Sequence, residues 1–210
     1  MAQIFGNFSD NLPNGQEYLT VVFAPSSAPL KQRWQNNSLS ADFIAEYFAN
    51  FFPETTENHI ETSLKAEVKS AVSFISNELL ENAMKFNDDT LQQPVTMTLQ
   101  MYSDKLVFLA TNSVNSQSTI KFKEFIEELI TSDPSDFYIN QLEKNAEDEM
   151  IGSSGLGFLT MINDYLAKLG WKFETMKKEP PVDTVTTMVE LTVYQLHSSS
   201  ISQELETYAN

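Results

Sequence analysis

A single apolar stripe organises the middle of the chain, in the stretch from Val68 to Asp88. At about 100° per residue a helix here would also place Glu78, Asn82 and Lys85 together, about 90° away from the stripe. The apolar residues recur at intervals of four, three, four, four and three positions, which predicts one face of a long α-helix. They are Val68, Val72, Ile75, Leu79, Ala83 and Phe86. A carboxylate, an amide and an ammonium are therefore expected at the border of the core.

The simplest interpretation of this polar edge is a solvated helix surface. Glu81 and Lys85 stand four positions apart, and such pairs contribute only a few tenths of a kcal/mol on an exposed helix. Polar side chains beside an apolar stripe occur on any amphipathic helix. Spacing alone therefore assigns no function to Glu78, Asn82 or Lys85, and a second feature around Gly155 is needed to argue for one.

The composition of the 210-residue chain restricts the chemistry that it can perform. The absence of cysteine excludes disulfides and thiolate metal sites, and the presence of only two histidines leaves little scope for zinc. The net charge of −16 opposes binding to nucleic acids and anionic membranes, although backbone amides and a divalent metal could still hold one nucleotide. No apolar run could span a bilayer, and the first residues lack a signal-peptide pattern. We therefore expect a soluble, cytoplasmic protein.

Strands are expected in adjacent pairs along the chain. Alternating or β-branched runs separated by short turns or connections indicate paired strands. These pairs are expected at Val95–Met101 with Lys105–Ala110, and at Trp171–Met176 with Thr184–Tyr194. Tyr18–Ala24 is expected to form a further strand, after a turn-rich lead-in over residues 1–17. A fold built from sequential βαβ units is therefore disfavoured, because the strands occur next to each other in pairs.

Further helices are expected on both sides of these strands. One begins at Ser40 and carries Phe43, Tyr47 and Phe51 on one face, which favours a core or a homodimer contact. Others are expected around 122–130, 135–144 and 155–169. The order of elements predicts an α+β fold, a two-layer α/β sandwich with a mixed, mostly antiparallel sheet and helices on one face. We expect a strand and an aromatic helix over 1–60, a core over 61–196 and a polar tail over 197–210.

A glycine-rich segment, IGSSGLGFLTMINDY at 151–165, leads into the last of these helices. Gly155 and Gly157 stand where a loop turns into a helix, and the free amides and dipole of a helix N-terminus favour an anion. Ser153 and Ser154 add hydroxyl donors. The segment is not a Walker P-loop, because Phe158 follows Gly157 where that motif has lysine. A tight turn with close helix packing would explain the glycines equally well.

Taken together, the two stretches resemble a known superfamily. ELLENAMKF at 78–86 and GSSGLGF at 152–158 are similar to the N box and the second glycine box of the GHKL ATPases, which share the Bergerat ATP-binding fold. A glutamate four residues before the asparagine most resembles the serine/threonine kinases of bacterial partner switching, of the anti-sigma-factor type. LTMINDYLAKLGWKFE at 159–174 is similar to SiaB-like and cyanobacterial regulators of that branch.

This resemblance implies a role for each matched residue. Glu78 would be the general base for the attacking hydroxyl, Asn82 the Mg²⁺ ligand, and Lys85 a phosphate contact. Phosphates would also meet the backbone amides or hydroxyls of Ser153, Ser154, Gly155, Leu156 and Gly157. The implied cofactors are ATP and Mg²⁺. The implied activity is phosphorylation of Ser or Thr on a small regulatory protein, opposed by a phosphatase.

One part of the superfamily pattern is missing. After the first hairpin the GHKL proteins carry D-x-G-x-G, whose aspartate accepts the adenine amino group. Here ATNSVN at 110–115 places Asn112 nearest to that position and contains no glycine. The Asn112 amide oxygen can still accept a hydrogen bond, but the close approach to the base is lost. The intact Glu78 and Asn82 favour a kinase, the missing glycines favour a non-catalytic regulator of the same fold, and an unrelated α+β module remains a third hypothesis.

Overall fold

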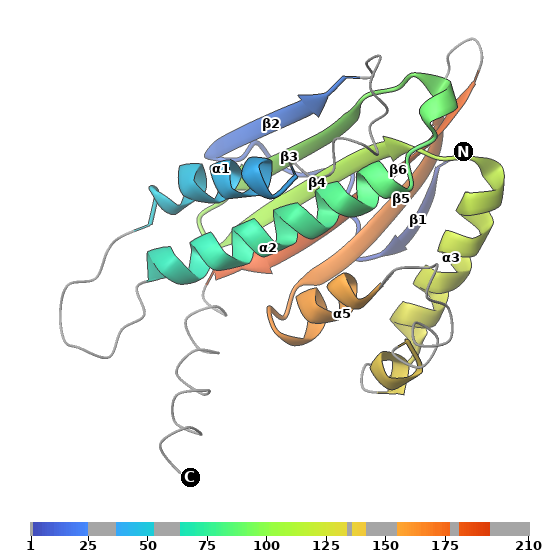
Figure 1. Ribbon diagram of the computed structural model, residues 1–210. Helices are drawn as coiled ribbons and strands as arrows, with labels where there is room; N and C mark the ends of the chain where they lie inside the picture. The colour runs from blue at the N-terminus through green and yellow to red at the C-terminus, as the bar shows by residue number, and fades with distance from the viewer. Residues whose placement is uncertain are drawn as a thin grey trace.

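The protein forms one six-stranded antiparallel sheet with helices over one face (Figure 1). The computed structural model describes residues 2–24, 37–52, 64–133, 136–141, 155–176 and 181–193. The order of strands across the sheet is β1-β5-β6-β4-β3-β2. The strands are β1 (Gln3–Gly6), β2 (Glu17–Phe23), β3 (Val95–Met101), β4 (Lys105–Ser113), β5 (Lys168–Met176) and β6 (Val182–Thr192).

Three helices, α1, α2 and α5, lie over one face of this sheet, while α3 lies along the side of β1 (Figure 1). The helical segments are α1 (Asn37–Ala49), α2 (Leu64–Lys85), the short 3₁₀ helix η3 (Asp89–Leu91), α3 (Ser116–Thr131) and α5 (Leu156–Asn163). Residues 136–141 add one further short helix. The predicted α+β class is confirmed, although the described strand pairs are all antiparallel rather than mixed. None of the described helices has the length and apolarity needed to cross a bilayer.

The predicted stripe of α2 forms the centre of the core. Five of its six apolar residues are buried against the sheet and the other helices, namely Val68, Val72, Ile75, Leu79 and Ala83. Phe86 is the exception, because α2 ends at Lys85 and the chain leaves the helical path there. On the flank of α2 that faces α1, Ser73 Oγ donates to Asp42 Oδ1 at 2.7 Å.

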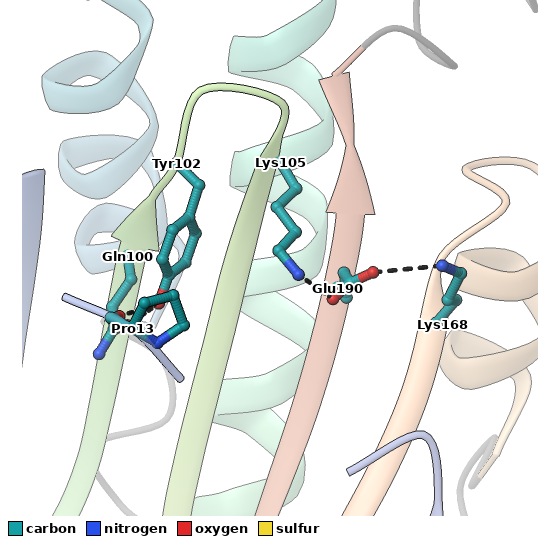
Figure 2. Close-up of polar contacts among 6 residues, drawn as sticks. All are labelled: Pro13, Gln100, Tyr102, Lys105, Lys168 and Glu190. Atoms are coloured by element: carbon teal, nitrogen blue, oxygen red, sulfur yellow. Dashed lines mark hydrogen bonds and ion pairs between the residues drawn. The ribbon is translucent and has the colours of Figure 1, made fainter. Parts of the chain in front are cut away.

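The prediction of a turn-rich lead-in over residues 1–17 was wrong. The first residues form β1, whose four residues are too few to show an alternating pattern, and residues 7–16 then cross to the opposite edge of the sheet. The hydroxyl of Tyr102 donates to the Pro13 carbonyl at 2.9 Å, as Figure 2 shows. This crossing explains why Val107 and Met188 are buried although they point away from the helices.

A charged cluster lies on the same face, beside the crossing segment. Glu190 of β6 accepts from Lys105 at 2.7 Å and from Lys168 at 3.3 Å, so one carboxylate joins three neighbouring strands (Figure 2). Lys172 pairs with Asp10 at 2.8 Å, which ties the crossing segment to β5. Partly exposed pairs of this kind contribute little energy individually. These side chains and the crossing segment cover the face opposite the helices near β5 and β6.

The helix expected over 155–169 is shorter than predicted. It ends at Asn163, because Leu166 adopts a positive φ of 51° and the Ala167 amide donates to the Met161 carbonyl at 2.9 Å. Strand β5 therefore begins at Lys168, before Gly170. Gly170 lies within β5 and against the backbone of Asn7 and Phe8, where a Cβ atom would be 2.8 Å from the Asn7 carbonyl carbon.

Strand β4 and helix α3 are both longer than predicted. The strand continues past Ala110 through Ser113, and the helix begins at Ser116, before position 122, with its N-cap at Asn115. The side chain of Asn115 accepts from the Ser118 amide at 2.8 Å. Such local side-chain hydrogen bonds are what favour asparagine at helix N-termini. Asn112 consequently lies in a strand and not in a loop.

Candidate functional site

The side chain of Glu78 on α2 lies directly against the backbone of Gly157 on α5. A Cβ atom placed on Gly157 would lie 2.8 Å from Cδ and 3.2 Å from Cγ of Glu78, and closer still to Oε2. A side chain at position 157 and the present carboxylate position therefore exclude each other. This contact brings together two stretches that are far apart in the chain.

The flank of α2 that carries Glu78 is the one that faces α5. Phe74 lies one helical turn before Glu78, and its ring stacks on Tyr165, just after α5, with centroids 5.4 Å apart. Residues four positions apart share one side of a helix. This flank therefore contacts Gly157 of α5 through the Glu78 carboxylate and Tyr165, after α5, through the Phe74 ring.

Burial is the main influence on the ionisation of Glu78. It raises the pKa of the carboxyl group, the charge on Glu81 raises it further, and Lys85 opposes both effects. A carboxylate with a raised pKa is a stronger proton acceptor than an exposed one, which suits a general base. The raised pKa of Glu78 is therefore compatible with the role of general base that the resemblance implies.

Gly155 is required by the backbone at the start of α5. It is the N-cap residue with φ of +99°, and a Cβ atom there would be 2.7 Å from the ring of Phe125. The helix begins immediately afterwards at Leu156, so the amides of its first turn have no carbonyl partners within the helix. Ser153 and Ser154, which were also predicted to contact phosphates, lie outside the described residues.

Asn82 and Lys85 follow Glu78 toward the C-terminal end of α2. Asn82 is half-buried and lies one turn beyond Glu78, about 6 Å along the helix axis. Lys85 is exposed, with Nζ 5.4 Å from the centre of the Phe86 ring. The contact to Gly157 is made by Glu78, whereas Asn82 and Lys85 lie nearer to the end of β4.

Asn112 lies buried at that end of β4. Its Nδ2 donates to the carbonyl of Ser113 at 3.0 Å, and only 5% of the residue is exposed. Ser113 donates from its amide and its hydroxyl to Asn87 Oδ1, at 3.2 and 2.9 Å, and the Asp88 amide donates to the Ser113 carbonyl at 3.0 Å. The segment after α2 is thereby fixed to the strand that carries Asn112.

These contacts define the two ends of the candidate site. Glu78 joins α2 to α5, and Asn87 joins the chain after α2 to β4. Asn82 and Lys85 lie between these two points. No motif in the sequence points to Asn87 and Ser113, because their hydrogen bonds depend on where α2 and β4 end.

A separate hollow of about 200 Å³ lies between α3 and the ends of β1, β5 and β6. Lys123 reaches over it, with Nζ 4.8 Å from the centre of the Phe173 ring. Its lining residues are Gln3, Val114, Thr119, Lys123, Phe173, Glu174, Thr175, Asp183 and Thr184. None of the predicted site residues lines this hollow, and sequence reasoning missed it because its walls come from four different elements and the connecting residue Val114.

The described residues contain no group of three or more His, Cys, Asp or Glu side chains that could hold a metal ion. The amide oxygen of Asn82 is a hard ligand of the kind that Mg²⁺ accepts, and Mg²⁺ commonly takes its other ligands from water and phosphate. Asn82 would therefore supply one ligand to a metal whose other ligands come from outside the protein. No protein-family model matches the chain, and no curated protein matches it significantly.

Proposed function

We propose that this protein is an ATP- and Mg²⁺-dependent kinase that phosphorylates a serine or threonine of a small regulatory protein. The observation that carries the proposal is the contact between Glu78 and Gly157. It supports the resemblance to GHKL kinases, because a general base must lie beside the amides that hold the transferring phosphate. The two stretches meet although nothing in their spacing along the chain requires it.

Each group of the site has a distinct task in this reaction. Glu78 accepts the proton of the partner's hydroxyl while that oxygen bonds to the γ-phosphorus and the bond to the ADP oxygen breaks. Its raised pKa, caused mainly by burial, increases its affinity for that proton. The first-turn amides of α5 and the Lys85 ammonium hold phosphate oxygens, and Asn82 holds the metal. ATP supplies the phosphoryl group.

A second function is favoured by the environment of Asn112. This residue is almost completely buried, and its Nδ2 is committed to the Ser113 carbonyl. An adenine ring would therefore have to reach the Oδ1 atom inside a packed region. The observation supports a non-catalytic regulator that uses the same fold to bind a partner, in the manner of an anti-sigma factor, and holds nucleotide weakly or not at all.

Calorimetric titration with Mg-ATP distinguishes the two functions. For a kinase we expect heat of binding in the wild-type protein and in Glu78→Gln, and its loss in Asn82→Ala. Slow release of phosphate from ATP, with water as the acceptor, should disappear in Glu78→Gln. Glu81→Gln is the matched control, because it removes a carboxylate one turn away, and it should retain both signals. Absence of heat at millimolar Mg-ATP in the wild-type protein would reject the kinase and leave the regulator.

A further inference from the structure

Strand β2 is an edge strand of the sheet, and within the described residues no further strand pairs with its outer side. It pairs with β3 over all seven of its residues without a bulge, and it contains neither lysine nor proline. On the face opposite the helices, Tyr18 and Val22 are 65% and 57% exposed. Natural proteins normally protect long apolar edges with charge, proline or a bulge. The other edge, β1, is shorter, and Lys123 of α3 reaches it through a hydrogen bond to Gln3.

Helix α1 extends the apolar surface around the same border. It lies over the β2 and β3 side of the sheet, next to α2 (Figure 1). Tyr47 of α1 interacts with Glu17 at the start of β2, and the Tyr47 ring packs on Phe48 and Phe51. Phe43, one turn before Tyr47, is 59% exposed. Phe51 is 46% exposed as well, so two of the three residues of the predicted aromatic face lie at the surface, while the neighbouring Phe48 is buried in the core.

We propose that β2 pairs with β2 of a second copy of this chain, antiparallel and around a two-fold axis at Thr20. This register makes the strand complementary to itself. Tyr18 lies opposite Val22 of the second copy on the exposed face, and Leu19 lies opposite Val21 on the other. Aromatic and β-branched residues are favourable cross-strand partners. The same axis brings the exposed sides of the two α1 helices together beneath a continuous twelve-stranded sheet (twice the six strands of one copy).

The charge pattern favours a second copy in spite of the net charge of −16. Glu17 is the only charged residue of β2 and lies at its first position. In the antiparallel register the two Glu17 residues stand at opposite ends, about 20 Å apart at 3.4 Å per residue. That separation exceeds the Debye length of about 8 Å at physiological ionic strength. The paired strands therefore meet without close like charges, and added salt should strengthen the dimer by screening the rest of the surface.

A cross-link at the axis tests the register. The chain has no cysteine, so Thr20→Cys introduces a single thiol that can react only with its own copy. Residues directly opposite in an antiparallel pair have Cα atoms about 4.5–5.5 Å apart, within the range of a disulfide. We expect oxidation, or a short bismaleimide, to convert most of this variant to a covalent dimer. Thr98→Cys on the neighbouring strand β3 is the matched control and should remain a monomer on a denaturing gel.

The mass in solution tests the interface independently of any cross-link. Light scattering should give about twice 23.8 kDa for the wild-type protein. Val22→Lys should raise the dissociation constant of the dimer at least tenfold. Ile120→Lys, at a similarly exposed position on α3 (60%), should leave it unchanged. A monomeric wild-type protein at 100 µM or above (roughly a hundredfold over a micromolar dissociation constant) would overturn the proposal, as would equal cross-linking of both cysteine variants. The proposal does not depend on ATP binding.

Discussion

The contact between Glu78 and Gly157 predicts that two substitutions will be energetically coupled. Alanine is favoured over glycine within a helix by about 0.5–1 kcal/mol. In the wild-type protein Gly157→Ala should not show this stabilisation, because the new Cβ atom would overlap the Glu78 carboxylate. In a Glu78→Ala background the overlap disappears, and the same substitution should become stabilising.

The size of the coupling follows from what the carboxylate must do. With the new Cβ atom only 2.8 Å from Cδ, the Glu78 side chain has to leave its rotamer or push α5 away. An off-rotamer side chain costs about 0.5–1.5 kcal/mol, and overpacking costs about 1–3 kcal/mol. Glu78 is a flexible side chain that is only half-buried, so we expect the lower part of these ranges. The coupling energy should be about 1–2 kcal/mol.

The assay is a double-mutant cycle on the free energy of unfolding. Denaturant titration of the wild-type protein, Gly157→Ala, Glu78→Ala and the double variant gives the coupling directly. Gly155→Ala serves as the control for a glycine two positions away. Its positive φ costs about 1–3 kcal/mol for any other residue, and its Cβ atom would meet Phe125, so it should destabilise both backgrounds equally. A Gly157–Glu78 coupling below about 0.5 kcal/mol, the lower limit for residues in contact, would refute the contact.

Three further predictions follow from particular residues. The folded state raises the pKa of Glu78, so ionisation of this carboxyl group opposes folding once the pH exceeds its unfolded pKa of about 4.3. Thermal denaturation should therefore show Glu78→Gln to be more stable than the wild-type protein at pH 7 and equal to it below about pH 4. Ser113→Ala removes the hydroxyl that donates to the buried Asn87 Oδ1 and keeps the backbone amide that donates to the same atom. It should lower the free energy of unfolding by about 1–3 kcal/mol in urea titration, while the exposed Ser116→Ala should change little. Gly170→Ala should lower the free energy of unfolding by about 1–3 kcal/mol or more, because the new Cβ atom would overlap the backbone near Asn7. Faster proteolytic cleavage within residues 7–16, the segment before β2, should report its release from the sheet.

Periodicity was sufficient to predict the elements that are long and half-buried. The stripe of α2 and the alternation of β3 specify which faces are buried, and both agree with the structure. Strand β1 could not be predicted because four residues, QIFG, carry no alternation and are held by pairing with β5. The end of α5 depends on a positive φ at Leu166, which a leucine does not signal.

The candidate site shows a similar division. Glu78 and the glycines were predicted from residue type and resemblance, and their contact is a matter of tertiary packing that the spacing along the chain does not contain. Gly155 and Gly157 looked alike in the sequence, yet one is required by its backbone angle and the other by the approach of a carboxylate. The network of Asn87 and Ser113 was not predictable, because an asparagine after a helix usually indicates only a turn and the predicted strand ended at Ala110, before Ser113.

The most direct test of the central claim observes the amides at the start of α5 while Mg-ATP is added. The chain has only six glycines, so their amide signals are readily assigned in a ¹⁵N-resolved NMR spectrum. We predict that Gly155 and Gly157 shift with saturable dependence on Mg-ATP, while Gly6, Gly15 and Gly170 do not, and that Asn82→Ala abolishes the shifts. Unchanged Gly155 and Gly157 signals at millimolar Mg-ATP would contradict a phosphate site between α2 and α5.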